Sequence, residues 1–230
     1  MAELAGIRHR FRAVVFDLDG TLIDSAGDIA DVLNACLVEQ GIAPFDEPAV
    51  TAMIGGGARV LVERALRRLG RMDEAVLAER LRVDFERRYG DLGAGRSVVY
   101  PGGRELLAEL AAREVGLAIC TNKPEAITLR TLAELDLARW FGAVVGETAA
   151  LPRKPHPAML LAAIERLGST PNQTVMVGDS AADVGAARGA CVPVVAVSFG
   201  YTTTPAAALG ADALIDHLSE LPGALVELRR

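Results

Sequence analysis

Two aspartates near the start of the chain have the spacing needed for phosphoryl transfer. Asp17 and Asp19 follow the apolar, β-branched run 12–16, and Gly20 comes directly after them. If the backbone stays near extended, the two carboxylates flank a common point while Leu18 turns back into the core. One carboxylate can then attack phosphorus, while the other protonates the departing alkoxide and later activates water. Gly20 lets the chain turn and bring backbone N–H groups close to an anion.

Two further aspartates follow another apolar run, 173–177. Together with Asp17 and Asp19, Asp179 and Asp183 bring the number of carboxylates in the predicted site to four. Like charges a few ångströms apart raise each other's pKa, and a divalent cation resolves the repulsion. Oxygen ligands select Mg²⁺, which typically takes one or two carboxylates and completes its shell with waters and phosphate oxygens. We therefore predict Mg²⁺ as the cofactor; the alternative is that these aspartates are helix caps and loop formers.

A hydroxyl and an ammonium group are predicted to hold the phosphate. Thr121 and Asn122 stand at the end of the run 116–121, and Lys154 precedes a proline-rich helix start. Thr121 can donate its hydroxyl and Lys154 its ammonium to the phosphoryl oxygens. The chain has 22 arginines but two lysines, Lys123 and Lys154, and both stand beside or within these anion sites. A compact ammonium suits a crowded phosphate pocket better than a planar guanidinium; for Lys123, a surface position is the alternative.

An alternation of strands and helices must position these residues. Apolar runs predict strands, and amphipathic segments between them predict helices. Strands alternating with helices imply a parallel sheet covered by helices on both faces, with ligands beyond the carboxyl ends of its strands. The predicted strands are 12–16, 116–121, 143–146, 173–177, 192–197 and 213–215, and the predicted helices are 103–113, 125–135, 157–167 and 181–190.

The first crossover is too long for a simple strand–helix–strand unit. About 100 residues separate Thr21 from Thr121, whereas such a unit needs about 30. The surplus contains no convincing strand, and its patterns predict helices over 25–40, 48–54, 58–69 and 74–89. Ser25 and Asp28 resemble a capping box, Asp73 is a candidate cap, and Gly90 is a candidate terminator. We predict a core of residues 1–23 and 93–230 and a helical insert, here called the cap, of residues 24–92, with a second linker at 91–102.

Four motifs stand in order over nearly the whole chain. They are Asp17-Leu-Asp-Gly-Thr-Leu-Ile-Asp-Ser25, Thr121 at the end of a hydrophobic strand, Lys154-Pro-His-Pro157, and Gly178-Asp-Ser-Ala-Ala-Asp183. Together they resemble the phosphatase branch of the haloacid dehalogenase superfamily. The resemblance implies a Rossmann-like α/β core, an all-helical cap inserted after the first strand, and Mg²⁺-dependent hydrolysis through an aspartyl-phosphate.

The resemblance also assigns roles to the motif residues. Asp17 is expected to be the nucleophile and a metal ligand, and Asp19 the acid/base that also offers its backbone carbonyl to the metal. Asp179 is expected as a further metal ligand, with Asp183 behind it through water or hydrogen bonds. The phosphate is expected to contact Gly20, Thr121, Asn122 and Lys154.

Other segments resemble the bacterial phosphoglycolate phosphatases within this superfamily, namely 54–58, 61–66, 121–124 and 175–180. The resemblance points to 2-phosphoglycolate as the substrate. Its carboxylate needs a cation or a helix N-terminus, and the glycines around Gly56, together with Arg59 or Arg64, are candidates. The alternative for the two arginines is a solvated helix face.

Two other interpretations of the same core stay open. One is a pyrophosphatase, or a sugar-phosphate phosphatase or mutase; Ala158 stands where mutases often have a carboxylate. The other is a signalling switch in which an aspartyl-phosphate persists. Asp19 argues against a switch because it can activate water and discharge the intermediate.

The composition excludes several classes of protein. With 51% hydrophobic and 23% charged residues, the chain is too apolar to be disordered. The net charge of −6 and the absence of a long basic run argue against a nucleic-acid partner. Apolar runs such as 192–199 are too short for a membrane span, and 1–12 lacks the apolar centre of a signal peptide. Three scattered cysteines indicate neither disulfides nor zinc. We expect a cytoplasmic monomer or homodimer that acts on a small phosphorylated metabolite.

Overall fold

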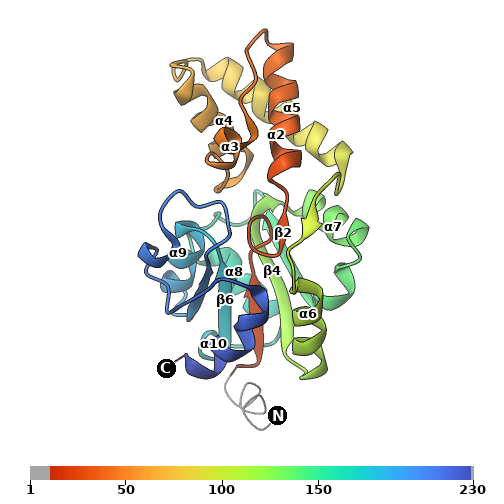
Figure 1. Ribbon diagram of the computed structural model, residues 1–230, viewed down its shortest axis with the longest axis vertical. Helices are drawn as coiled ribbons and strands as arrows, with labels where there is room; N and C mark the ends of the chain where they lie inside the picture. Colours follow the sequence, from red (N-terminus) through yellow and green to blue (C-terminus); the bar gives the residue numbers. More distant parts are fainter. Residues whose placement is uncertain (1–10, 229–230) are drawn as a thin grey trace.

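The computed structural model of the protein describes residues 11–228. The ends of the predicted core, 1–10 and 229–230, lie outside the described residues, as does most of segment 1–12, where we expect no signal peptide. Figure 1 shows a sheet flanked by helices, with a group of further helices beyond the carboxyl ends of its strands. Among residues 11–228, no helix combines the length and the apolar character needed to cross a membrane.

The main sheet has six strands in the order β5-β4-β1-β6-β7-β8, and all neighbouring pairs are parallel. Counted along the chain, this is the order 3-2-1-4-5-6 of doubly wound folds, whose ligands bind where the order reverses, beside the first strand. The strands are β1 (Ala13–Phe16), β4 (Gly116–Pro124), β5 (Ala143–Glu147), β6 (Thr174–Gly178), β7 (Val194–Val197) and β8 (Ala213–Ile215). Each of the predicted strands is present, so the parallel α/β fold is confirmed.

Helices cover both faces of the sheet because the strands are apolar on both faces. In β1, Val14 and Phe16 belong to one hydrophobic cluster, and Val15 between them belongs to the cluster on the opposite face. The flanking helices are α6 (Gly103–Ala112), α7 (Glu125–Glu134), α8 (Ala158–Arg166), α9 (Ala181–Gly189) and α10 (Leu221–Glu227). Short 3-10 helices lie at Ala138–Trp140, Pro171–Gln173, Ala206–Ala208 and Leu218–Glu220.

Between β1 and α6 the chain forms four helices, as the sequence predicts: α2 (Ala26–Glu39), α3 (Glu47–Thr51), α4 (Gly57–Arg68) and α5 (Ala75–Leu92). They pack around a hydrophobic cluster of their own, which includes Leu33, Val62 and Phe85. From α7, Ile127 also joins this cluster. The limits 24–92 for the cap and 1–23 with 93–230 for the core stay predictions.

Three local expectations about this region are wrong. Ser25 and Asp28 form no capping box, because Asp28 accepts hydrogen bonds from the Arg96 backbone N–H at 3.0 Å and the Ser97 hydroxyl at 2.5 Å. Helix α5 passes through Gly90 to Leu92, and it begins after Glu74, not after Asp73. Tertiary packing outweighs the small intrinsic cost of one glycine inside a long helix.

The chain also forms two short strands where no strand was predicted. The strands β2 (Ile23–Asp24) and β3 (Val98–Val99) pair antiparallel with each other. Two residues are too few to produce an alternating pattern, so the sequence alone does not reveal them. The pair joins the segment that enters the cap to the segment that leaves it.

Candidate active site

The loop after β1 presents Asp17 and Asp19 to one cavity. The Asp17 backbone N–H donates to the carbonyl of Val177 in the neighbouring strand at 2.9 Å, and its Oδ1 accepts the N–H of Leu18 at 2.7 Å. Leu18 itself is fully buried in the core. The expected arrangement, with Leu18 turned inward between two carboxylates that face the cavity, is therefore present.

Lys154 lies between the carboxylates of Asp17 and Asp183. Its Nζ is 2.9 Å from Oδ1 of Asp17, 2.6 Å from Oδ1 of Asp183 and 2.7 Å from the carbonyl oxygen of Cys120. The side chain is almost fully buried. Burial alone would lower the pKa of Lys154, but the carboxylates of Asp17 and Asp183 raise it above its ordinary value, so the group stays charged.

Asn122 positions Lys154 through the backbone. Its amide Nδ2 donates to the Lys154 carbonyl at 3.0 Å, and its Oδ1 accepts the Lys154 N–H at 3.0 Å. Asn122 also lines the cavity, where its backbone N–H and the second N–H of its amide nitrogen are the groups that could contact a phosphate. Thr121, beside it in β4, is buried and lines the cavity.

One carboxylate oxygen from each of Asp17, Asp179 and Asp183 lies within 4.8 Å of the others. Burial raises the pKa of Asp17 to about 6, with Lys154 lowering it and Asp183 raising it. Burial, followed by the charges of Asp183 and Asp17, raises the pKa of Asp179 to about 8. Burial, together with the neighbouring carboxylates, therefore disfavours the negative charge of Asp17 and Asp179. The oxygen donors fit a hard divalent cation such as Mg²⁺, which would offset this charge.

The two carboxylate oxygens of Asp183 contact different residues. Oδ1 contacts Lys154, and Oδ2 accepts hydrogen bonds from the backbone N–H and the hydroxyl of Ser180 at 3.0 and 2.6 Å. These contacts fasten the start of α9 next to the site. That Asp183 stands behind the metal ligands stays a prediction.

Gly20 allows the β1 loop to pass directly over Asp179. Its φ is +83°, and a Cβ at this position would lie 2.6 Å from Oδ2 of Asp179. A side chain would therefore be strained and would collide with the carboxylate. Asp179 is further held by the Tyr201 backbone N–H, which donates to Oδ2 at 2.7 Å.

Sequence reasoning missed the partners of Asp19. Its Oδ1 accepts hydrogen bonds from the Ser25 hydroxyl at 2.7 Å and from Nζ of Lys123 at 3.0 Å. Lys123 also donates to the hydroxyl of Tyr89 in α5 at 2.8 Å, so a surface position for Lys123 is excluded. Burial alone would lower the pKa of Lys123, but Asp19 and Tyr89 raise it. The scarcity of lysine in the sequence pointed to Lys123 as a residue of the site. It did not identify Asp19 and Tyr89 as its partners.

The cavity has a volume of about 600 Å³, and both the core and the cap line it. The core contributes Asp17, Asp19, Thr121, Lys154 and Asp179, and the cap contributes the glycines 55–57, Leu61, Arg64, Phe85 and Tyr89. All the predicted core residues are therefore brought together at one place. Of the predicted specificity residues, Gly56 and Arg64 line the cavity, whereas Arg59 is exposed and does not.

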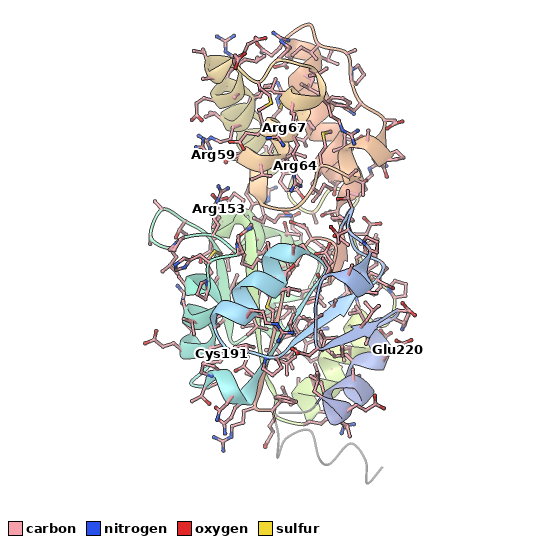
Figure 2. All side chains as sticks on the ribbon, turned by 90° about the vertical axis from the view of Figure 1, so that its left-hand side faces the viewer. Arg59, Arg64, Arg67, Arg153, Cys191 and Glu220 are labelled. Atoms are coloured by element: carbon pink, nitrogen blue, oxygen red, sulfur yellow. The ribbon has the colours of Figure 1, made fainter. Side chains whose placement is uncertain are left out.

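The glycine loop of the cap touches the core beside the cavity. Nη1 of Arg153 donates to the carbonyl of Gly56 at 3.1 Å, and it lies 3.4 Å from Oε1 of Glu147. Figure 2 shows Arg153 at the upper rim of the core, with Arg59, Arg64 and Arg67 above it in the cap. The Arg153 side chain thus links the two parts across the edge of the site.

Comparisons with known proteins agree with this geometry. A family model described as haloacid dehalogenase-like hydrolase matches residues 11–190. The chain is 44% identical over 214 residues to the phosphoglycolate phosphatase of Rhodospirillum rubrum, covering 91% of this chain and 89% of that protein. It is 40% identical over 215 residues to the phosphoglycolate phosphatase of Agrobacterium fabrum, covering 93% and 91%. The crystal structure of a predicted phosphoglycolate phosphatase from Haemophilus somnus matches with a TM-score of 0.86 and 30% identity, over 93% of this chain and 97% of that chain.

Proposed function

The chain belongs to the haloacid dehalogenase-like hydrolase family, and on that basis we propose that it is a Mg²⁺-dependent phosphatase whose substrate is 2-phosphoglycolate. The observation that carries the proposal is the cluster of Asp17, Asp179 and Asp183, two of which contact Lys154, with Asp19 in the same cavity as Asp17 and Asp179. The names of the curated relatives support the choice of substrate.

Asp17 is the nucleophile in the proposed reaction. One of its carboxylate oxygens bonds to phosphorus while the bond between phosphorus and the ester oxygen breaks, which leaves an aspartyl-phosphate. Asp19 gives its proton to the departing glycolate oxygen. In the second half, Asp19 takes a proton from a water whose oxygen attacks phosphorus, and this releases inorganic phosphate and restores Asp17.

The remaining residues hold the phosphoryl group and the metal. Lys154 and Thr121 donate to the phosphoryl oxygens, and the backbone around Gly20 and Asn122 approaches the same group. Asp17, Asp179 and the backbone carbonyl of Asp19 would hold the Mg²⁺, with Asp183 behind them. When bound, the ion offsets the charge of the carboxylates and of the phosphoryl oxygens.

Steady-state kinetics over a substrate panel test the proposal. The panel contains 2-phosphoglycolate, pyrophosphate, several sugar phosphates and a nucleotide, each assayed with Mg²⁺. We expect the highest kcat/KM for 2-phosphoglycolate. Stoichiometric phosphorylation without turnover would instead identify a signalling switch, and a higher kcat/KM for pyrophosphate would contradict the proposed substrate.

A sugar phosphate is the second candidate substrate. A cavity of about 600 Å³ offers more room than a two-carbon ester requires. Apolar side chains of the cap, including Leu61 and Phe85, line part of that space. If the panel ranks a sugar phosphate first, the catalytic roles stand and the substrate assignment changes.

A further inference from the structure

Lys123 is a buried cation in the cavity that the mechanism above does not use. It stands near the end of β4, and its side chain is 3% exposed. The ammonium lies 3.0 Å from Oδ1 of Asp19 and donates to the Tyr89 hydroxyl at 2.8 Å. Its Nζ is also 4.4 Å from the centroid of the Tyr89 ring. Lys123 is therefore held from two sides, by the core and by the cap.

The ammonium of Lys123 has hydrogen-bonding capacity for a ligand. An ammonium carries three N–H donors. Within residues 11–228, Asp19 and Tyr89 are its two hydrogen-bond acceptors. Lys154, in contrast, has three acceptors close to its Nζ, namely Asp17, Asp183 and the Cys120 carbonyl. Because Lys123 lines the cavity, its remaining N–H can serve a bound substrate.

Lys123 is placed where it could reach the carboxylate of 2-phosphoglycolate. In 2-phosphoglycolate, the carboxylate is attached to the same carbon that bears the ester oxygen. Asp19 must form a hydrogen bond with that ester oxygen to protonate it. The Lys123 ammonium donates to Asp19, so an ester oxygen that contacts Asp19 brings the attached carboxylate into the neighbourhood of this ammonium.

The arginines near the cavity are less suited to this task. Nη1 of Arg64 donates to the carbonyls of Met53 and Ile54 at 3.0 and 2.8 Å, within the cap. Arg59 is exposed and lies outside the cavity lining. Arg153 donates to Gly56 at the rim. These contacts leave Lys123 as the cation that is closest to the acid/base in the hydrogen-bond network.

We propose that Lys123 binds the carboxylate of the substrate and thereby selects 2-phosphoglycolate over phosphate esters without that charge, with Tyr89 holding the ammonium in place. This inference rests on the proposed function. It assigns to a core lysine the contact with the carboxylate for which the sequence offers Gly56, Arg59 and Arg64 of the cap as candidates.

The test compares two esters that differ in one charge. The substrates are 2-phosphoglycolate and the phosphate ester of glycolamide, which keeps the size, the planar end group and the ester oxygen. Wild-type enzyme should prefer the carboxylate ester in kcat/KM by about 10- to 100-fold, the range for a hydrogen bond to a charged group. Lys123→Met should bring this ratio close to one, and Lys123→Arg should retain part of it.

The ratio of the two kcat/KM values does not depend on how much of a variant is correctly folded. Both esters are assayed with the same preparation, so an inactive fraction of Lys123→Met lowers both rates and cancels in the ratio. Arg67→Met is the matched control, because Arg67 is a cap cation on α4 that does not line the cavity. It should change neither rate.

Three other outcomes would contradict either the role of Lys123 or the proposed substrate. If Lys123→Met lowers kcat/KM equally for both esters, Lys123 acts only through Asp19 and the proposal is wrong. If Arg64→Met abolishes the preference and Lys123→Met keeps it, the carboxylate binds to the cap arginine and the proposal is equally wrong. If the wild type itself shows no preference, the proposed substrate fails, and the assignment of Lys123 fails with it.

Discussion

Tyr201 donates its backbone N–H to Oδ2 of Asp179 over 2.7 Å. The hydroxyl of the same tyrosine accepts the backbone N–H groups of Ser25 and Ala26, at 2.6 and 3.0 Å, and donates to Oδ1 of Asp24 at 2.8 Å. One residue of the loop after β7 thus contacts a predicted metal ligand with its backbone and the start of α2 with its side chain. This contact links the predicted metal site to the entrance of the cap.

Replacement of Tyr201 by Phe should destabilise the protein. The N–H groups of Ser25 and Ala26 lie in buried residues. The variant removes the tyrosine hydroxyl that accepts both, although the Ala26 N–H keeps Oδ1 of Asp24 as a second acceptor at 3.2 Å. We expect the free energy of unfolding to fall by about 1–3 kcal/mol, measured by urea denaturation. An unchanged unfolding free energy would mean that water replaces the hydroxyl at no cost.

Replacement of Asp17 by Asn should abolish turnover and leave the fold intact. The amide keeps the shape of the side chain but cannot attack phosphorus, so kcat should fall by about 10³-fold or more. Circular dichroism should show a cooperative transition like that of the wild type. Asp31→Asn, at an exposed carboxylate of α2, is the control and should retain full activity. Activity of Asp17→Asn within tenfold of wild type would rule out Asp17 as the nucleophile.

Metal removal should silence the enzyme and make its stability depend on pH. In the metal-free protein, the raised pKa values of about 6 for Asp17 and about 8 for Asp179 mean that the fold favours the protonated carboxyl groups. Their contribution to stability is complete below the ordinary aspartate pKa and is lost as the pH rises through these values. The free energy of unfolding with chelator should therefore fall between about pH 4 and pH 8.

Added metal should offset the loss of stability at higher pH. Added Mg²⁺ should restore activity and raise the unfolding temperature most at the upper end of the pH range, because it binds the ionised carboxylates. Asp179→Asn removes the group with the higher pKa and should flatten the pH profile of the metal-free protein. Metal-independent hydrolysis, or a flat profile in the wild type, would contradict the assignment.

Replacement of Gly57 by Ala should disturb the contact between cap and core. A Cβ at Gly57 would lie 2.8 Å from the Asn122 carbonyl oxygen, whereas at Gly55 the nearest atom is Nη1 of Arg64 at 3.9 Å. Both glycines have positive φ, so each alanine should cost about 1–2 kcal/mol of stability. The collision affects Gly57 alone, and we expect kcat/KM to fall about tenfold further in Gly57→Ala than in Gly55→Ala. Equal losses in steady-state assays would show that cap position does not limit the reaction.

Much of the core and its site could be predicted from the sequence because the signals are local. Apolar runs predict the strands, and their order with the helices implies a parallel sheet. In such a sheet, residues that follow different strands meet at one edge, which is why Asp17, Thr121 and Asp179 could be placed together before any coordinates. The positions of the four cap helices also follow from their periodicity, although the ends of α5 do not.

Only the tertiary structure decided which groups pair with one another. Lys123 contacts Asp19 across 104 positions of the chain and Tyr89 across 34, and no periodic pattern records such distances. For the same reason, the sequence does not reveal that the Asn122 amide pairs with the Lys154 backbone. Nor does it reveal that the Ser25 hydroxyl donates to Asp19. A buried polar group takes whichever partner the packing of distant segments brings within hydrogen-bond distance, and that choice exists only in the folded chain.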